Sequence, residues 1–278
     1  MLIRLGYDIR FQLASSVPIV ALLNVHPSRE KDLVEPDRLT VSPDVPVEEF
    51  IDGFGNRMTR FLSPEGELRL TNSTLIRDSG EPDPQDVGAP EVPVEELPTE
   101  VLPYLMNSRY CEVDLLTPVA TELFGNVPRG YTRVQAICEW VHSKVTFGYH
   151  FARPTRTALD VYTERGGVCR DFQHLAVTFC RCLNIPARYV TGYLGDIGIT
   201  LPPSPMDFSA WFEAYLGGRW WTFDARHNIP RIGRVLMAVG RDATDVALTT
   251  SFGRAQLLRF EVVSDEVKEE EQIVEAAS

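Results

Sequence analysis

The spacing of apolar residues changes at one proline- and acid-rich segment, residues 78–100. Before this segment apolar and polar side chains alternate, most clearly over Leu2–Leu13, and a period of two buries one face of a sheet. After it, apolar residues recur at the 3.6-residue spacing of a helix, as over Val134–Val145. The chain is therefore predicted to be α+β, with a β-rich part preceding a mixed part.

Residues 1–77 are predicted to form an N-terminal β-sandwich-like module. Several short strand patterns follow the first one and are separated by turn signals such as Asp-Gly and Glu-Gly, which is typical of a sandwich. The predicted strands after the first are Val17–Val25, Leu39–Ser42, Val47–Ile51, Arg57–Leu62 and Glu67–Ile76. No group of residues in this module suggests catalysis, so a structural or docking role is the simpler interpretation.

The segment 78–100 is predicted to be a linker, because prolines and charges cannot propagate a helix or build a core. Residues 81–100 contain seven acids and no base. Residues 265–278, a predicted acidic tail, carry the rest of the excess negative charge. The formal charge of −12 lies entirely in these two stretches, so the rest of the chain is neutral. A chain with two acidic segments and no net positive charge elsewhere is a poor electrostatic match for the phosphate backbone, which argues against a nucleic-acid partner.

The cysteines and the lack of an export signal predict a cytoplasmic location. The chain has five cysteines, an odd and sparse set that suits reduced thiols. No apolar run approaches the roughly 20 residues of a membrane helix, so no membrane partner is expected. The five histidines are scattered, and neither a metal site nor a cofactor is predicted. The oligomeric state does not follow from the sequence.

A reactive cysteine is predicted at Cys169. It follows Gly166 and Gly167, whose flexibility suits a tight turn, and it begins an amphipathic helix. The positive end of a helix favours a thiolate, and Arg165 and Arg170 are expected to add positive charge. The alternative interpretation is a capped helix that carries an ordinary buried thiol.

A predicted hairpin supplies possible partners for this cysteine. The patterns Ser209–Leu216 and Arg219–Asp224 flank two glycines, which suits a two-residue primed turn. In that register Ser209 and Asp224 are diagonal neighbours on one face, roughly 7–8 Å apart. A base at position 209 could then be oriented by Asp224 beside the cysteine. Two later apolar runs are predicted strands of the same sheet, Arg234–Val239 and Leu257–Val263.

Four motifs in order resemble the bacterial transglutaminase-like superfamily. They are Gly-Gly-Val-Cys-Arg-Asp-Phe from 166, Asn-Ile-Pro-Ala-Arg-Tyr-Val-Thr-Gly-Tyr from 184, Ala-Trp-Phe-Glu-Ala-Tyr from 210 and Trp-Thr-Phe-Asp-Ala-Arg from 221. The resemblance covers roughly residues 101–264 and implies a papain-like α+β core with the Cys-bearing helix on an antiparallel sheet. It implies a Cys–His–Asp triad acting on peptide or protein amides by hydrolysis or transfer, with Cys169 as nucleophile and Asp224 as orienting acid.

The sequence departs from this family at the base, because Ser209 stands where the family has a His directly before Ala-Trp. A serine hydroxyl is no base near neutral pH. The alternative bases are His227, which strand parity puts on the opposite face unless the chain turns after Asp224, and His150. Tyr149 is a candidate for helping to hold the oxyanion, and an ordinary half-buried tyrosine is the alternative interpretation.

Two functions therefore stay open at this stage. The first is a cysteine amidase, peptidase or acyltransferase that forms a thioester at Cys169. The second is a catalytically inactive binding or scaffolding protein that keeps the cleft without the base. His174 lies about 140° around the helix from Cys169. For His227 and His150, a surface or capping role is the simpler interpretation.

Overall fold

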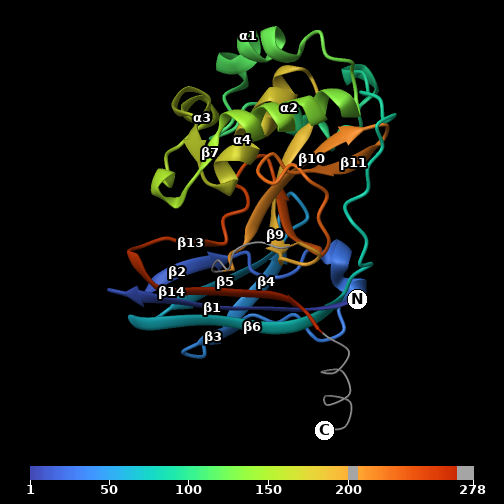
Figure 1. The fold of residues 1–278 in the computed structure, drawn as a ribbon. Helices are drawn as coiled ribbons and strands as arrows, with labels where there is room; N and C mark the ends of the chain where they lie inside the picture. The colour runs from blue at the N-terminus through green and yellow to red at the C-terminus, as the bar shows by residue number, and fades with distance from the viewer. Residues whose placement is uncertain (200–205, 268–278) are drawn as a thin grey trace.

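The computed structural model describes residues 1–199 and 206–267. Its helices gather at one end of the molecule and most of its strands at the other (Figure 1). The α-helices are α1 (Val113–Phe124), α2 (Tyr131–Lys144), α3 (Ala158–Glu164) and α4 (Cys169–Cys182). They accompany an antiparallel sheet in the order β11 (Arg219–Phe223), β10 (Ser209–Leu216), β9 (Ala187–Leu194) and β12 (Arg234–Gly240). The α+β core is thus as expected, with the Cys-bearing helix on an antiparallel sheet.

Residues 1–77 form strands close to the predicted ones. They are β1 (Leu2–Leu13), β2 (Val17–Ala21), β3 (Thr40–Ser42), β4 (Val47–Ile51), β5 (Arg57–Ser63) and β6 (Gly66–Arg77). These strands belong to two sheets whose inner side chains share one apolar cluster, to which Leu5 of β1 and Phe61 of β5 contribute. The sandwich-like arrangement follows from the alternating pattern, because each strand has one apolar face to bury.

The C-terminal strands correct one prediction. Leu257–Val263 was expected in the hairpin sheet, but it lies in β14 (Ala255–Glu266), which pairs with β1 in the sheet order β14-β1-β6-β3. Likewise β13 (Thr249–Ser251) pairs with β2 in the order β13-β2-β5-β4. The expectation was wrong because an apolar pattern of period two predicts a strand without specifying its partner. The last described residues therefore complete the N-terminal sandwich.

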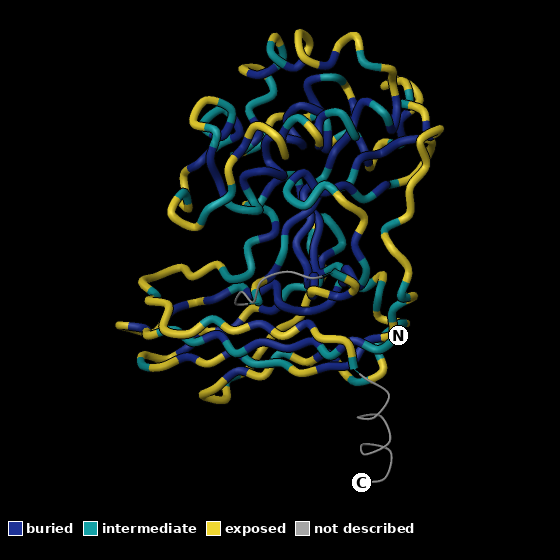
Figure 2. Tube along the Cα trace, viewed as in Figure 1, coloured by how far each residue is buried: buried dark blue, intermediate teal, exposed yellow. Residues whose placement is uncertain are grey.

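One apolar core continues from the sandwich into the sheet that carries the site. Ile3 of β1 shares a cluster with Tyr193 of β9 and with Val235 and Met237 of β12. Figure 2 shows this continuity as buried chain running between the two parts. Residues 1–77 therefore share one core with the sheet that carries the site, and removing the sandwich would expose the ends of β9 and β12.

The predicted linker is held in place by the residues around it. The backbone N–H of Gly130 donates to Glu91 Oε1 at 3.1 Å, and Arg133 forms an ion pair with Glu91 at 3.0 Å. Glu91 thus occupies the positive end of α2, where a carboxylate is favoured. Thr132 and Gln135 have the spacing of a capping box, but Thr132 lies inside α2, whose N-cap residue is Gly130. Residues 78–100 are therefore an integral part of the fold.

Short elements fill the connections. The 3₁₀ helices are η1 (Pro27–Asp32), η2 (Val94–Glu96), η3 (Leu102–Leu105) and η4 (Tyr149–Phe151). The strand β7 (Thr146–Phe147) pairs in parallel with β8 (Gly166–Gly167), just before α4. The predicted acidic tail lies outside the described residues from residue 268 onward, and its first two residues belong to β14.

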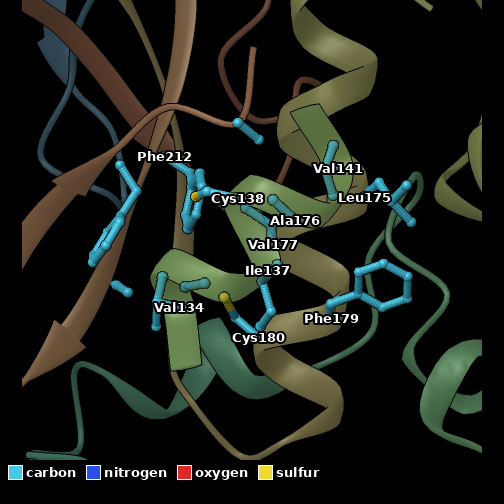
Figure 3. Packing of buried hydrophobic residues seen from close by; sticks show 14 of the residues in the cluster. Val134, Ile137, Cys138, Val141, Leu175, Ala176, Val177, Phe179, Cys180 and Phe212 are labelled. Carbon is cyan, nitrogen blue, oxygen red and sulfur yellow. The ribbon is translucent and has the colours of Figure 1, made fainter. Parts of the chain in front are cut away.

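Helix α4 is the centre of the core. Figure 3 shows Ile137 and Cys138 of α2 packed close to Ala176 and Cys180 of α4, with Phe212 of β10 beside them. The interpretation of Cys138 as a small core residue is therefore confirmed. Because α4 is packed by helices on one side and by β9 and β10 on another, its first residue is fixed relative to the sheet.

Candidate active site

Cys169 is the first residue of α4, as predicted. The carboxylate of Asp171 accepts the backbone N–H of Val168 at 3.0 Å and so closes the start of the helix. Gly167 permits this contact, because a Cβ there would lie 2.6 Å from the Asp171 Cβ. The turn itself is made by Arg165, which takes the left-handed conformation with φ of 59°. The glycine therefore serves close approach rather than the turn that we expected from it.

The two predicted cations do not face the thiol. The Arg165 guanidinium stacks over the Trp140 ring at 4.7 Å, on the far side of the helix start. The Arg170 guanidinium bonds the Asp171 carboxylate at 2.9 Å, so its charge is already paired. The expectation was wrong because neighbours in sequence at a helix start point in different directions.

The cation that acts on Cys169 comes from the turn after β11. Burial raises the pKa of Cys169 to about 11, and the nearby Arg226 guanidinium opposes this effect by favouring the thiolate. Arg226 is itself positioned by the Phe147 ring, which lies 3.9 Å from its guanidinium carbon. The Asp207 carboxylate also lies near the thiol and acts in the opposite direction.

Asp224 is 5% exposed and is one of the most extensively bonded carboxylates in the site. It accepts hydrogen bonds from Gln173 Nε2 at 3.0 Å and from an Arg234 guanidinium nitrogen at 2.9 Å. Burial alone would raise the pKa of Asp224, but the Arg234 charge and the hydrogen bonds of His227 hold it well below its usual range. Asp224 is therefore a fixed anion.

His227 is brought to Asp224 by a turn that Asp224 itself builds. The Asp224 carboxylate accepts the backbone N–H of His227 at 3.1 Å, and its carbonyl accepts the N–H of Asn228 at 2.8 Å. Asn228 has φ of 53°, which completes the reversal. His227 Nδ1 then lies 2.8 Å from Asp224 Oδ2. The expectation from strand parity does not apply here, because the strand ends at Phe223.

A pocket of about 520 Å³ brings together side chains that are distant in the sequence. Cys169, Ser209, His227 and Tyr149 all line it, together with the aspartate at position 207. The predicted hairpin register is confirmed, with Phe212 opposite Phe223 and Leu216 opposite Arg219. Ser209 begins β10 next to the pocket, while Asp224 follows β11 directly and turns toward His227.

The other predicted aromatic and histidine residues divide between surface and core. Tyr149 is 62% exposed, which is more open than the half-buried position that we considered for it. His150 is exposed, in agreement with the simpler interpretation of a surface histidine, and does not line the pocket with Cys169. His174 is fully buried.

His174 forms part of a stacked aromatic cluster beneath the site. Its ring lies 4.8 Å from the Tyr110 ring and 5.0 Å from the Tyr189 ring, measured between centroids. Its Nε2 accepts the backbone N–H of Ala243 at 3.1 Å. Burial lowers the pKa of His174 well below its ordinary value, so the ring is neutral at pH 7.

Acid is therefore expected to destabilise the protein through His174. Below about pH 6.5 the unfolded chain binds a proton at this position that the folded chain does not bind. The free energy of unfolding should fall by about 1.4 kcal/mol per pH unit from this group alone as the pH decreases. Urea unfolding at several pH values measures the slope. The variant His174→Gln should flatten it, the exposed-site control His142→Gln should not, and equal slopes in all three proteins would contradict the prediction.

Three supporting residues were missed by the sequence analysis, although two left a signal. Gln173 lies four residues after Cys169 and hence on the same face of α4, where it bonds both Asp224 and the Ala210 carbonyl. Asp207 lies two residues before Ser209, which places both on one side of an extended chain. Arg234 gave no signal, because its partner Asp224 comes from a different strand.

The described residues contain no group of three or more His, Cys, Asp or Glu side chains that could hold a metal ion. Within the same ranges, 1–199 and 206–267, no helix is long and apolar enough to cross a bilayer.

Comparison with known proteins identifies the family. Residues 117–225 match the transglutaminase-like superfamily. The solved structure of a candidate cysteine protease from Cytophaga hutchinsonii is 32% identical, with a TM-score of 0.83 over 96% of this chain and 91% of that chain. The chain belongs to the transglutaminase-like superfamily. An uncharacterized protein of Mycobacterium leprae is also similar, at 27% identity over 229 residues, which are 79% of this chain and 81% of that protein.

This transglutaminase-like chain resembles the Cytophaga structure over nearly its whole length, so the resemblance includes the sandwich as well as the core. The family assigned from the four motifs is thereby confirmed, as is the papain-like type of core.

Proposed function

We propose that this chain is a cysteine amidase of the transglutaminase-like type, in which Cys169 attacks an amide carbonyl of a peptide and His227 is the base. The observation that carries the proposal is that His227, bonded through Nδ1 to Asp224, lines the same pocket as Cys169. Nucleophile, base and orienting acid are then all present, although the usual base position holds Ser209.

The tautomer of His227 follows from its partner. Asp224 is a fixed anion and accepts a hydrogen bond from Nδ1–H, which keeps that proton on Nδ1 and leaves Nε2 as the basic nitrogen. Nε2 takes the thiol proton as the sulfur of Cys169 forms a bond to the carbonyl carbon. The C–N bond then breaks and the amine leaves with that proton, which gives a thioester. Attack by water breaks the C–S bond, releases the acid and restores the thiol; attack by an amine gives transfer.

The oxyanion of this reaction has candidate donors at the start of α4. The first backbone N–H groups of a helix have no intrahelical acceptor, and the positive helix end favours negative charge there. The Tyr149 hydroxyl lies on the same pocket and is a further candidate donor. The Arg226 cation, which already favours the Cys169 thiolate, would add to this stabilisation.

An acyl-enzyme experiment tests the proposal. A p-nitrophenyl ester of a blocked amino acid should give a burst of nitrophenol, and mass spectrometry should find the acyl group on Cys169. The variant Cys169→Ala should lose both signals. Product analysis with and without an added amine then distinguishes hydrolysis from transfer. Turnover that survives in Cys169→Ala would contradict the proposal.

A histidine introduced at position 209 tests where the base resides. If His227 is the base, Ser209→His should change ester turnover by less than about tenfold, because the proton acceptor is already present. The burst assay measures the turnover, and far-UV circular dichroism close to that of the wild type shows that the variant is folded. A gain of a hundredfold or more would mean that the parent lacks a working base.

One observation favours the alternative function, a binding protein without catalysis. Burial raises the pKa of Cys169 to about 11, so almost no thiolate exists at pH 7 without help from a base. Such a protein would label with iodoacetamide at pH 7 as slowly as a buried thiol, and it would give no burst.

The five free cysteines suit a reducing compartment, and we infer a cytoplasmic location on that basis.

A further inference from the structure

A second cleft opens on the other side of the cysteine. Cys169, Asp207 and Ser209 line both this cleft and the smaller pocket that contains His227. The smaller pocket is rich in charged and hydrogen-bonding groups, whereas the second cleft extends toward the sandwich. The reacting sulfur therefore lies where two differently lined spaces meet.

The sandwich supplies one wall of the second cleft, and this wall is apolar. Ile9 and Phe11 of β1 line it, as do Leu257 and Phe260 of β14. Leu257 is 52% exposed although it is a large apolar residue, and it faces the hollow. Exposed apolar side chains gathered in a concave surface are typical of a binding site.

An irregularity in strand pairing produces this wall. Ile9 lies opposite Phe260 and Phe11 opposite Leu257, so three residues of β1 face a stretch of β14 that is four residues long. Positions three apart on a regular strand point to opposite faces. The extra residue, Leu258, shifts the alternation and lets Leu257 and Phe260 line the same cleft.

We propose that this second cleft binds a bulky apolar side chain of the peptide whose carbonyl Cys169 attacks. The identity of the occupant rests on the proposed function, because the cleft is continuous with the nucleophile and a bound amide must place neighbouring residues in it. Val246 and Leu248 add to the apolar lining, while Arg170 and Asp207 line the cleft as charged residues. The sandwich is then a specificity element of the enzyme rather than a separate docking module.

Equilibrium binding of two matched peptides tests the cleft without any chemistry. Isothermal titration compares acetyl-Ala-Phe-Ala-amide with acetyl-Ala-Gly-Ala-amide on the full chain. The phenylalanine peptide should bind at least about tenfold more tightly, which is the effect expected for burying one large apolar side chain. Equal affinities, or no binding of either peptide at millimolar concentration, would overturn the proposal.

Two neighbouring leucines provide a matched pair of variants. Leu257→Asp should weaken binding of the phenylalanine peptide about tenfold and leave the glycine peptide unchanged, since it places a charge in the apolar wall. Leu258 is 50% exposed but does not line the cleft, so Leu258→Asp should change neither affinity. Leu257→Ala, the milder change, should give a smaller loss in the same direction. Equal effects of the two aspartate variants would overturn the proposal.

The two proposals fail in different ways. Ester turnover and iodoacetamide labelling of Cys169, measured on the same samples, report the nucleophile alone. Selective binding of the phenylalanine peptide without turnover would support the proposal for the apolar cleft and contradict the proposed amidase activity. Turnover without selectivity between the peptides would contradict the proposal for the cleft and support the proposed amidase activity.

Discussion

Replacing His227 with alanine is expected to lower the turnover of an activated ester by about 10²–10⁴-fold, the usual contribution of a general base. The reason is that His227 is the histidine that the Asp224 carboxylate holds at 2.8 Å within the pocket of Cys169. The assay is steady-state release of nitrophenol at neutral pH. The decrease should appear in kcat, with little change in KM, because the imidazole acts on the thiol proton.

His150→Ala is the control for this experiment, since His150 is exposed in a nearby 3₁₀ helix and does not line the pocket. It should retain turnover within about twofold, as expected for a surface change. Unchanged turnover in His227→Ala, together with a large gain in Ser209→His, would place the missing base at position 209. The chain would then be the catalytically inactive binding protein, the alternative function considered above.

Replacing Arg234 with methionine is expected to lower the free energy of unfolding by about 3–5 kcal/mol, the cost of removing one partner from a buried ion pair. Arg234 bonds Asp83 at 2.8 Å and Asp224 at 2.9 Å, and little of its side chain reaches solvent. Without it, two carboxylates remain buried with no compensating charge. Urea unfolding at pH 7 measures the loss.

Arg60→Met is the matched control, because Arg60 also pairs with a carboxylate, Glu48, but both side chains are largely exposed. Exposed pairs contribute about 0–1 kcal/mol, so this variant should unfold close to the parent. A loss of the same small size in Arg234→Met would show that the cluster around Asp224 has water or another cation available. In that case the fixed charge that we assign to Asp224 would need another source.

The parts of the site that were predictable depend on short-range rules. The start of α4 at Cys169 follows from the apolar stripe and the Gly-Gly pair, and the hairpin register follows from a two-residue turn. Strand parity alone puts His227 on the opposite face, because the parity rule assumes that a strand continues; the turn after Asp224 is the exception that the sequence analysis left open. Asp224 ends the strand by binding the backbone two and three residues ahead, which is a local hydrogen-bonding effect that alternation does not contain.

The parts that were not predictable depend on which distant segments meet. Glu91 caps α2 and Asp83 bonds Arg234, yet both lie in a segment whose composition indicates a linker. The burial of His174 likewise depends on Tyr110 and Tyr189, which come from two other parts of the chain. Composition describes what a segment can do alone, whereas these residues act through charges and rings contributed by other elements.

The pairing of β1 with β14 has a consequence for how the protein is made. β1 is synthesised well before β14, and it can acquire this neighbour only after residues 255–266 have been translated. Until then one edge of a long apolar strand stays unpaired, which is a hazard for aggregation in a nascent chain. Because β14 also provides half of the apolar wall, the growing polypeptide can form the second cleft only after β14 has been made. A ribosome-bound chain that stops before residue 255 would thus carry Cys169 and His227 without the wall that selects what they act on.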